Sequence, residues 1–178
     1  MTAGPDAGRH LWVLRHAKAA ADGPDDHGRP LTGRGARQAA DLARRIADGP
    51  GPGGPLPTTV LCSSARRALQ TAELVAPVLG ERVELVVERA LYQADPDDVV
   101  ARLGELPDTT PAVMVVGHNP TLHDLVGLLL APADDAGRAG LDEGFAPATL
   151  AVVALPPGRW SVSPLGTGTL SALWRPGG

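Results

Sequence analysis

The sequence predicts an α/β fold, a three-layer α/β/α sandwich built around a mostly parallel sheet. Apolar runs of strand length alternate along the chain with segments of helical periodicity, which is the order that produces such a sheet. The runs are apolar at almost every position, as expected for strands that are covered on both faces. A chain of 178 residues fits one domain, which we place at 10–174 after a flexible N-terminus at 1–9.

Six apolar runs are the predicted strands of the sheet. Four of them alternate with helical segments and lie at 10–15, 59–63, 83–87 and 112–117. The other two lie close together near the end of the chain, joined by a Pro-Pro-Gly sequence that is typical of a turn. We therefore expect a closing hairpin made of 148–155 and 159–165.

Two amphipathic helices are predicted after the first and second strands. Apolar residues recur at helical spacing over 31–49, and Thr32 is placed to cap the start of that helix. A similar stripe runs through 65–80, where Pro77 should bend the end of the helix.

A third helix is predicted over 119–130, after the fourth strand. Asn119 is placed to cap it, and Pro120 suits the first helical turn. Proline and glycine gather at 48–57 and again around 130–147, so both segments are predicted surface connections. The second is long enough to be a flap or a mobile loop.

Composition and charge narrow the function classes. The net charge of −4 disfavours nonspecific binding to nucleic acids or membranes, although a local cationic cleft could still bind a small anion. No apolar run approaches the roughly 18 residues that span a bilayer, and the first residues lack the features of a signal peptide, so we expect a cytoplasmic protein. Cys62 is the only cysteine, which excludes an internal disulfide. No long exposed apolar stripe requires a partner, and we expect a monomer.

Basic and hydroxyl-bearing residues gather where the predicted strands end. Ligands of open α/β sheets bind at the carboxyl ends of the strands, so these residues are the candidate site. In chain order they are Arg15-His16, Ser63-Ser64 followed one turn later by Arg66-Arg67, Glu88-Arg89 and Gly117-His118.

This set of side chains suits phosphoryl chemistry. Guanidinium groups bind phosphate oxygens bidentately and stabilise the charge that develops on a transferring phosphoryl group. Backbone N–H groups at a helix start attract the same anion, and His118 directly precedes the predicted cap Asn119. An imidazole that is partly neutral near pH 7 can attack phosphorus, so no metal or other cofactor is needed.

Four motifs resemble the histidine phosphatase superfamily. They are "LRHAK" at 14–18, "RPLTGRG" at 29–35, "SSARRALQTA" at 63–72 and "VVGHNP" at 115–120. They occur in the order typical of that family, and the resemblance extends from about residue 11 to about residue 170. Within the family the chain is similar to the small phosphohistidine phosphatase branch, whose members act on phosphorylated histidine of signalling proteins.

The resemblance implies roles for individual residues. His16 would be the nucleophile that becomes phosphorylated, while Arg15, Arg67 and His118 would complete a phosphate pocket beside Asn119. Arg67 is preferred over Arg66 because the family pattern Arg-Ala-x-x-Thr matches Arg67, Ala68 and Thr71. Spacing alone does not exclude Arg66 from the phosphate pocket.

One feature departs from the commonest family pattern, and one residue is the candidate proton donor. Ala17 follows the Arg-His pair where many members have glycine, although a small residue is kept. Glu88 stands where ester-cleaving relatives commonly have their proton donor, and we predict it as the general acid. A phosphohistidine substrate weakens the need for that donor, because its imidazole leaving group can already be protonated on the other nitrogen.

The predicted function is a metal-independent phosphatase that forms a phosphohistidine on His16 and dephosphorylates phosphohistidine in proteins. A broad phosphomonoesterase of small phosphate esters and a non-catalytic module that binds phosphate or phosphoproteins are the alternatives. A metallohydrolase using His16, His118 and nearby aspartates is a further alternative, which Arg15 and Arg67 oppose because they would repel a cation. Other basic side chains are left outside the predicted site: His10, Lys18, His27, Arg29 and His123.

Overall fold

A twisted sheet in the order β3-β2-β4-β1-β5-β6 forms the centre of the protein in a computed structural model that describes residues 8–49, 53–162 and 164–177. The four strands from β3 to β1 are mutually parallel, whereas β5 runs antiparallel to both β1 and β6. Within the described residues the strands are β1 (Arg9–Arg15), β2 (Thr59–Ser63), β3 (Glu84–Glu88), β4 (Ala112–Gly117), β5 (Leu150–Leu155) and β6 (Thr169–Trp174).

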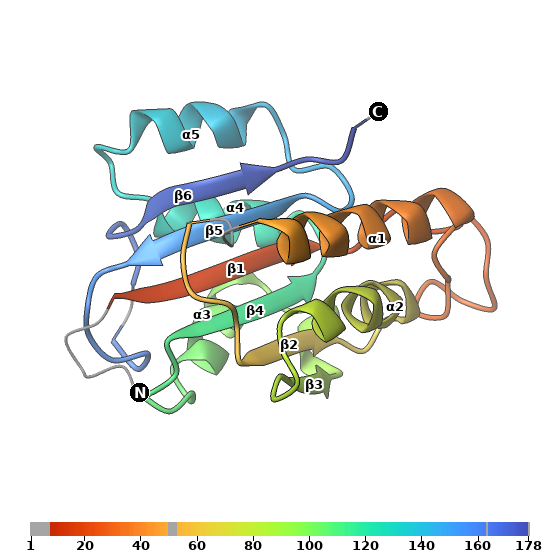
Figure 1. Ribbon diagram of the computed structural model, residues 1–178, viewed down its shortest axis with the longest axis horizontal. Helices are drawn as coiled ribbons and strands as arrows, with labels where there is room; N and C mark the ends of the chain where they lie inside the picture. Colours follow the sequence, from red (N-terminus) through yellow and green to blue (C-terminus); the bar gives the residue numbers. More distant parts are fainter. Residues whose placement is uncertain (1–7, 50–52, 163, 178) are drawn as a thin grey trace.

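Helices cover both faces of the sheet, which confirms the predicted three layers (Figure 1). One face packs against α1 (Gly33–Asp48) and α2 (Arg66–Val75), and the other against α3 (Pro96–Leu103), α4 (Thr121–Leu129) and α5 (Asp135–Asp142). Along β1, Leu11 and Val13 belong to one core cluster and Trp12 and Leu14 to the other. Because successive strand residues point to opposite faces, this double burial explains the continuous apolar run.

The first two helices begin and end as the sequence predicts. The Thr32 hydroxyl caps α1 by accepting a hydrogen bond of 3.0 Å from the Gly35 N–H. The α-helical geometry of α2 stops at Val75, and Pro77 lies in a single 3₁₀ turn, Ala76–Val78, that follows it.

Asn119 does not cap α4, contrary to the prediction. Pro120 occupies the cap position, and no side chain caps the helix. The Asn119 amide nitrogen instead donates to the Phe145 carbonyl at 2.9 Å, so this side chain ties α4 to the segment after α5. That contact spans 26 residues and leaves no local signal in the sequence.

The structure contains two helices that the sequence analysis does not predict. The segment 130–147 is not a continuous loop, because it holds α5, whose start is capped by the side chain of Asp134. Helix α3 was not predicted, although Asp95 and Asp98 form a reciprocal capping box at its start. Short helices of about two turns carry too few apolar positions to give a clear period.

The last strand lies at Thr169–Trp174 and not at 159–165. Strands β5 and β6 do pair antiparallel, but the connection between them is long and contains Trp160. This side chain is 1% exposed, and its indole N–H donates to the Thr110 carbonyl at 2.9 Å. Trp160 therefore packs into the core, whereas Val162 and Leu165 are exposed, and the described residues of this segment form no strand.

The first strand begins one residue before the predicted strand at 10–15. Strand β1 begins at Arg9, and the guanidinium of Arg9 donates to the carbonyl of Pro156. The segment 1–9 is predicted to be flexible, and its residues 1–7 lie outside the described residues. Among the helices described, none combines the length and the hydropathy that crossing a bilayer requires.

Candidate active site

Three neighbouring strands bring the predicted site residues to one edge of the sheet. His16 follows β1, Ser63 ends β2 and His118 follows β4, and these strands are adjacent in the order β2-β4-β1. The His16 N–H donates to the Gly117 carbonyl at 3.0 Å, which fixes the two histidine-bearing strand ends together. The rings of His16 and His118 lie 5.1 Å apart between centroids.

The backbone fixes the tautomer of His16. Its Nδ1 lies 2.7 Å from the Ala17 carbonyl, and because a carbonyl only accepts, Nδ1 carries the proton. The lone pair is then on Nε2, which accepts a hydrogen bond of 3.3 Å from Nε of Arg67. Burial, aided by the charges of Arg67, Arg15 and Arg29, lowers the pKa of His16 to about 4. The ring is therefore a neutral imidazole at pH 7, with its nucleophilic nitrogen towards a guanidinium.

His118 is held by the end of β2. Its Nε2 lies 2.7 Å from the Ser63 hydroxyl, while Nδ1 is buried without a partner among the described residues. Burial and then the neighbouring His16 and Arg67 lower the pKa of His118 to about 3. A buried ring nitrogen without a partner is available to a ligand that enters between the two histidines.

Arg15 and Asn119 share one acceptor. Arg15 donates through Nη1 to the Phe145 carbonyl at 2.7 Å, and Asn119 donates to the same oxygen at 2.9 Å. Nε of Arg15 is buried with no partner in the described part of the chain, and burial lowers the pKa of this guanidinium. The segment after α5 thus holds Arg15 at the site and leaves it a free donor.

The structure places Arg67 in the site and Arg66 on the surface. Arg67 is 5% exposed and contacts His16, whereas Arg66 is exposed at the start of α2. One turn later the Thr71 hydroxyl accepts from the Ala17 N–H at 3.0 Å and donates to the Arg67 carbonyl at 2.7 Å. This bridge packs α2 against the fully buried Ala17, where a large side chain has no room.

Glu88 is not brought together with the other predicted residues. It lies at the end of β3, an edge strand, where Oε1 accepts from both Nε and Nη2 of Arg102 in α3 at 2.8 Å. Among the described contacts its carboxylate has none with His16, Arg67 or His118. A carboxylate held by a guanidinium is an acceptor rather than a proton donor, so this position does not favour the predicted role as general acid.

The structure also brings three residues to the site that sequence reasoning missed. Asp26 pairs with Arg67 at 3.2 Å, and the Tyr92 hydroxyl donates to the same carboxylate at 2.6 Å. His27, which the sequence analysis left outside the site, lies 2.9 Å from the Ser64 hydroxyl and packs edge-on against Tyr92. The ring of Tyr92 in turn packs edge-on against His118. Asp26 and His27 lie shortly before the motif at 29–35, separated from it by Gly28, and this nearness is the one sequence signal that pointed to them.

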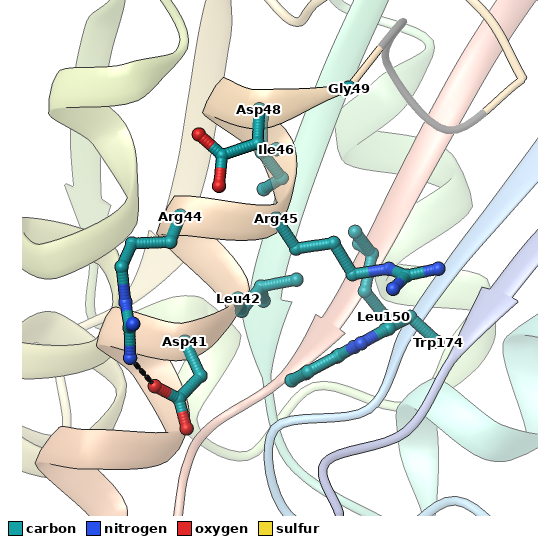
Figure 2. A pocket seen from close by; sticks show the side chains of 9 residues that line it. All are labelled: Asp41, Leu42, Arg44, Arg45, Ile46, Asp48, Gly49, Leu150 and Trp174. Atoms are coloured by element: carbon teal, nitrogen blue, oxygen red, sulfur yellow. Dashed lines mark hydrogen bonds and ion pairs between the residues drawn. The ribbon is translucent and has the colours of Figure 1, made fainter.

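A hollow of about 650 Å³ lies away from these residues, beside the second half of α1 (Figure 2). Side chains of α1 line it together with Leu150 of β5 and Trp174 of β6, and no predicted site residue does. It also borders Gly49, next to residues outside the described part of the chain.

The fold and the site define an α/β protein with a neutral, half-buried imidazole among arginine side chains, an arrangement suited to accepting a phosphoryl group. The comparison with known families agrees. The chain belongs to the histidine phosphatase superfamily (branch 1), which matches residues 11–99 and so includes His16 and Arg67.

Individual relatives cover more of the chain. The uncharacterized protein Rv1276c of Mycobacterium tuberculosis is 35% identical over 151 residues, which are 83% of this chain and 90% of that protein. A structure named as a candidate phosphohistidine phosphatase SixA from Nakamurella multipartitia is 29% identical, with a TM-score of 0.80 over 99% of both chains. The protein histidine phosphatase SixA complexed with tungstate is 26% identical, with a TM-score of 0.73 over 92% of this chain and 95% of that one. Together, the family and these neighbours support a phosphatase.

Proposed function

We propose that the protein is a metal-independent phosphatase that works through a phosphohistidine intermediate on His16 and removes phosphate from phosphohistidine in proteins. The observation that carries this proposal is the state of His16. Its Nδ1 proton is held by the Ala17 carbonyl, which leaves the lone pair on Nε2, and the one described side-chain contact of Nε2 is the hydrogen bond of 3.3 Å from Nε of Arg67. The nucleophile is thus neutral and oriented before the substrate arrives.

In the first step the Nε2 lone pair of His16 forms a bond to phosphorus. The phosphorus–nitrogen bond of the substrate breaks, and its electron pair stays on the departing imidazole, which already carries a proton on its other nitrogen and leaves neutral. Arg15, Arg67 and His118 stabilise the equatorial oxygens through their donors. The positive charge that develops on the His16 ring is stabilised by the Ala17 carbonyl at Nδ1.

In the second step water attacks phosphorus and the bond to Nε2 of His16 breaks. The electron pair returns to Nε2, and both protons of the water leave with the phosphate, as dihydrogen phosphate. His16 thereby regains its starting form, so the cycle needs no metal and no other cofactor.

Two observations support phosphohistidine as the substrate. The structural neighbours include the protein histidine phosphatase SixA, and an imidazole leaving group does not need the proton donor that Glu88 would have supplied. With this substrate the protein would be a monomeric, cytoplasmic enzyme that acts on signalling proteins, as the sequence predicts.

The test is phosphate release by the wild type and by His16→Ala, with a chelator present, from a phosphohistidine protein and from an aryl phosphate. We expect release by the wild type only and a higher kcat/KM on the phosphohistidine protein. Equal or higher kcat/KM on the aryl phosphate would identify a broad phosphomonoesterase instead. Binding of phosphate without release from either substrate would identify a binding module.

The variant must remain folded for this test to decide. His16 lies just after a strand end, and its ring packs against His118 rather than in either large core cluster. We expect the circular dichroism spectrum and the cooperative unfolding of His16→Ala to match the wild type. An unfolded variant would contradict the placement of this side chain at a ligand site.

A further inference from the structure

The side chain of Asp26 joins three separate parts of the chain at the candidate site. Its Oδ2 accepts from the Tyr92 hydroxyl at 2.6 Å and from Nη2 of Arg67 at 3.2 Å. Its Oδ1 accepts from Nη2 of Arg29 at 2.6 Å and from Nε of Arg29 at 2.9 Å. The two-step mechanism uses none of these contacts, although Arg67 takes part in it.

Asp26 determines how Arg67 is oriented. Besides the carboxylate contact, the main-chain carbonyl of Asp26 accepts from Nη1 of Arg67 at 2.6 Å, so both ends of the guanidinium fork are held by one residue. Nε then points at Nε2 of His16. The guanidinium carbon also lies 5.9 Å from the Tyr92 ring centroid, which restricts it further. An arginine side chain otherwise has considerable rotamer freedom, and these contacts remove it.

We propose that Asp26 is a positioning residue of this phosphatase site, which holds Arg67 towards His16 while Tyr92 and Arg29 hold Asp26. The inference rests on the proposed function. Asp26 would act through Arg67 and need not touch the substrate. The Asp26 carboxylate lies close to Arg67 and therefore weakens the positive potential that attracts phosphate. We expect Asp26 to stabilise the transition state rather than to strengthen phosphate binding.

Asp26→Asn tests this proposal, because it keeps the size of the side chain and removes its charge. We expect kcat on an aryl phosphate to fall about ten- to a hundredfold, the cost of a misplaced catalytic group, with KM unchanged or lower. Asp22→Asn is the matched control: it lies in the same segment, is exposed, and makes no hydrogen bond or ion pair among the described residues. A fall in kcat that is equal for both variants would overturn the proposal.

A double-mutant cycle shows whether Asp26 acts through Arg67. In an Arg67→Ala background, Asp26→Asn should change kcat by no more than about twofold, since the group that it positions is gone. If the two substitutions multiply their separate effects, Asp26 has an independent role and the proposal is wrong. Thermal unfolding of each variant separates this result from a simple loss of folded protein.

Nuclear magnetic resonance gives a readout that does not depend on turnover. The Nε–H signal of Arg67, identified by its loss in Arg67→Lys, should exchange slowly with solvent in the wild type. Its exchange rate should be about tenfold higher or more in Asp26→Asn. In Asp22→Asn the exchange rate should equal that of the wild type. An unaltered signal in Asp26→Asn would overturn the proposal even if the enzyme is active. If the wild type hydrolyses neither substrate, the proposed function fails while this measurement still decides whether Asp26 fixes Arg67.

Discussion

At His16 the backbone decides which ring nitrogen is the nucleophile. The Ala17 carbonyl holds the proton on Nδ1, and the adjacent Arg67 discourages a second proton on Nε2. Both effects come from neighbours that are fixed before any substrate binds. The ionisation of the imidazole is therefore set by burial and nearby charge rather than by its ordinary pKa.

The pH dependence of turnover follows from this environment. Because the pKa of His16 is lowered to about 4, the imidazole stays neutral, and nucleophilic, well below pH 6.5. We expect kcat/KM on an aryl phosphate to be nearly constant from pH 7 to about 5 and to fall only as the pH approaches 4. An acid limb with its midpoint near 6.5 would show instead that His16 titrates as an exposed histidine.

A substitution of Glu88 tests whether this residue takes part in catalysis. Its carboxylate is held by Arg102, so Glu88→Gln should lower kcat on a phosphohistidine protein by less than about threefold. Any loss on an aryl phosphate should be similar. A loss of a hundredfold or more that is confined to phosphate esters would confirm the sequence-based prediction that Glu88 is the general acid, through a rearrangement that frees it from Arg102.

Among the elements, the first five strands and the two long helices could be predicted because their signals are local. Continuous apolar runs mark β1 and β4, and Thr32 and Pro77 mark the limits of two helices. The last strand could not be separated from 159–165, since a buried Trp160 looks like a strand residue in the sequence.

The candidate site likewise contains residues that the sequence identifies and contacts that only the structure shows. His16, Arg67 and His118 stand at strand or helix ends within motifs, and the structure does bring them together. The contact of Asp26 with Tyr92 joins residues 66 positions apart, and only folding shows it.

Helix α1 is placed by a glycine that lies very close to the loop after β1. A Cβ added at Gly35 would lie 2.1 Å from the Lys18 carbonyl oxygen, and that carbonyl already accepts from Thr32. We expect Gly35→Ala to lower the free energy of unfolding by about 1–3 kcal/mol, because a tightly packed backbone must move. It should also lower kcat, since Lys18 is two residues from His16.

Gly33→Ala is the matched control for this helix. Its added Cβ would lie 3.7 Å from the nearest atom, a terminal nitrogen of Arg37, which is an ordinary contact. In chemical unfolding it should be within about 1 kcal/mol of the wild type, or more stable, because alanine favours helix. Equal losses in the two variants would mean that the close approach of Gly35 to Lys18 does not explain the effect.

Considered as a whole, the molecule keeps two half-buried neutral imidazoles where three neighbouring strands end. The pKa values of His16 and His118 are lowered to about 4 and about 3, mainly by burial, while both would be near 6.5 in the unfolded chain. Between these limits the unfolded state binds more protons than the folded state, so stability falls as the pH decreases below about 6.5. Above that pH the two residues contribute no pH dependence.

The resulting loss of stability is measurable. Each histidine should lower the free energy of unfolding by about 2 kcal/mol between pH 7 and pH 5, since one unit of pKa difference corresponds to about 1.4 kcal/mol. Urea unfolding at the two pH values measures the loss, with His16→Asn/His118→Asn as the comparison. That variant lacks both His16 and His118 and should lose most of the pH dependence, apart from a smaller share from His10, whose pKa burial also lowers. If the wild type and the variant lose the same stability, His16 and His118 accept protons in the folded protein, and a neutral nucleophile at low pH is excluded.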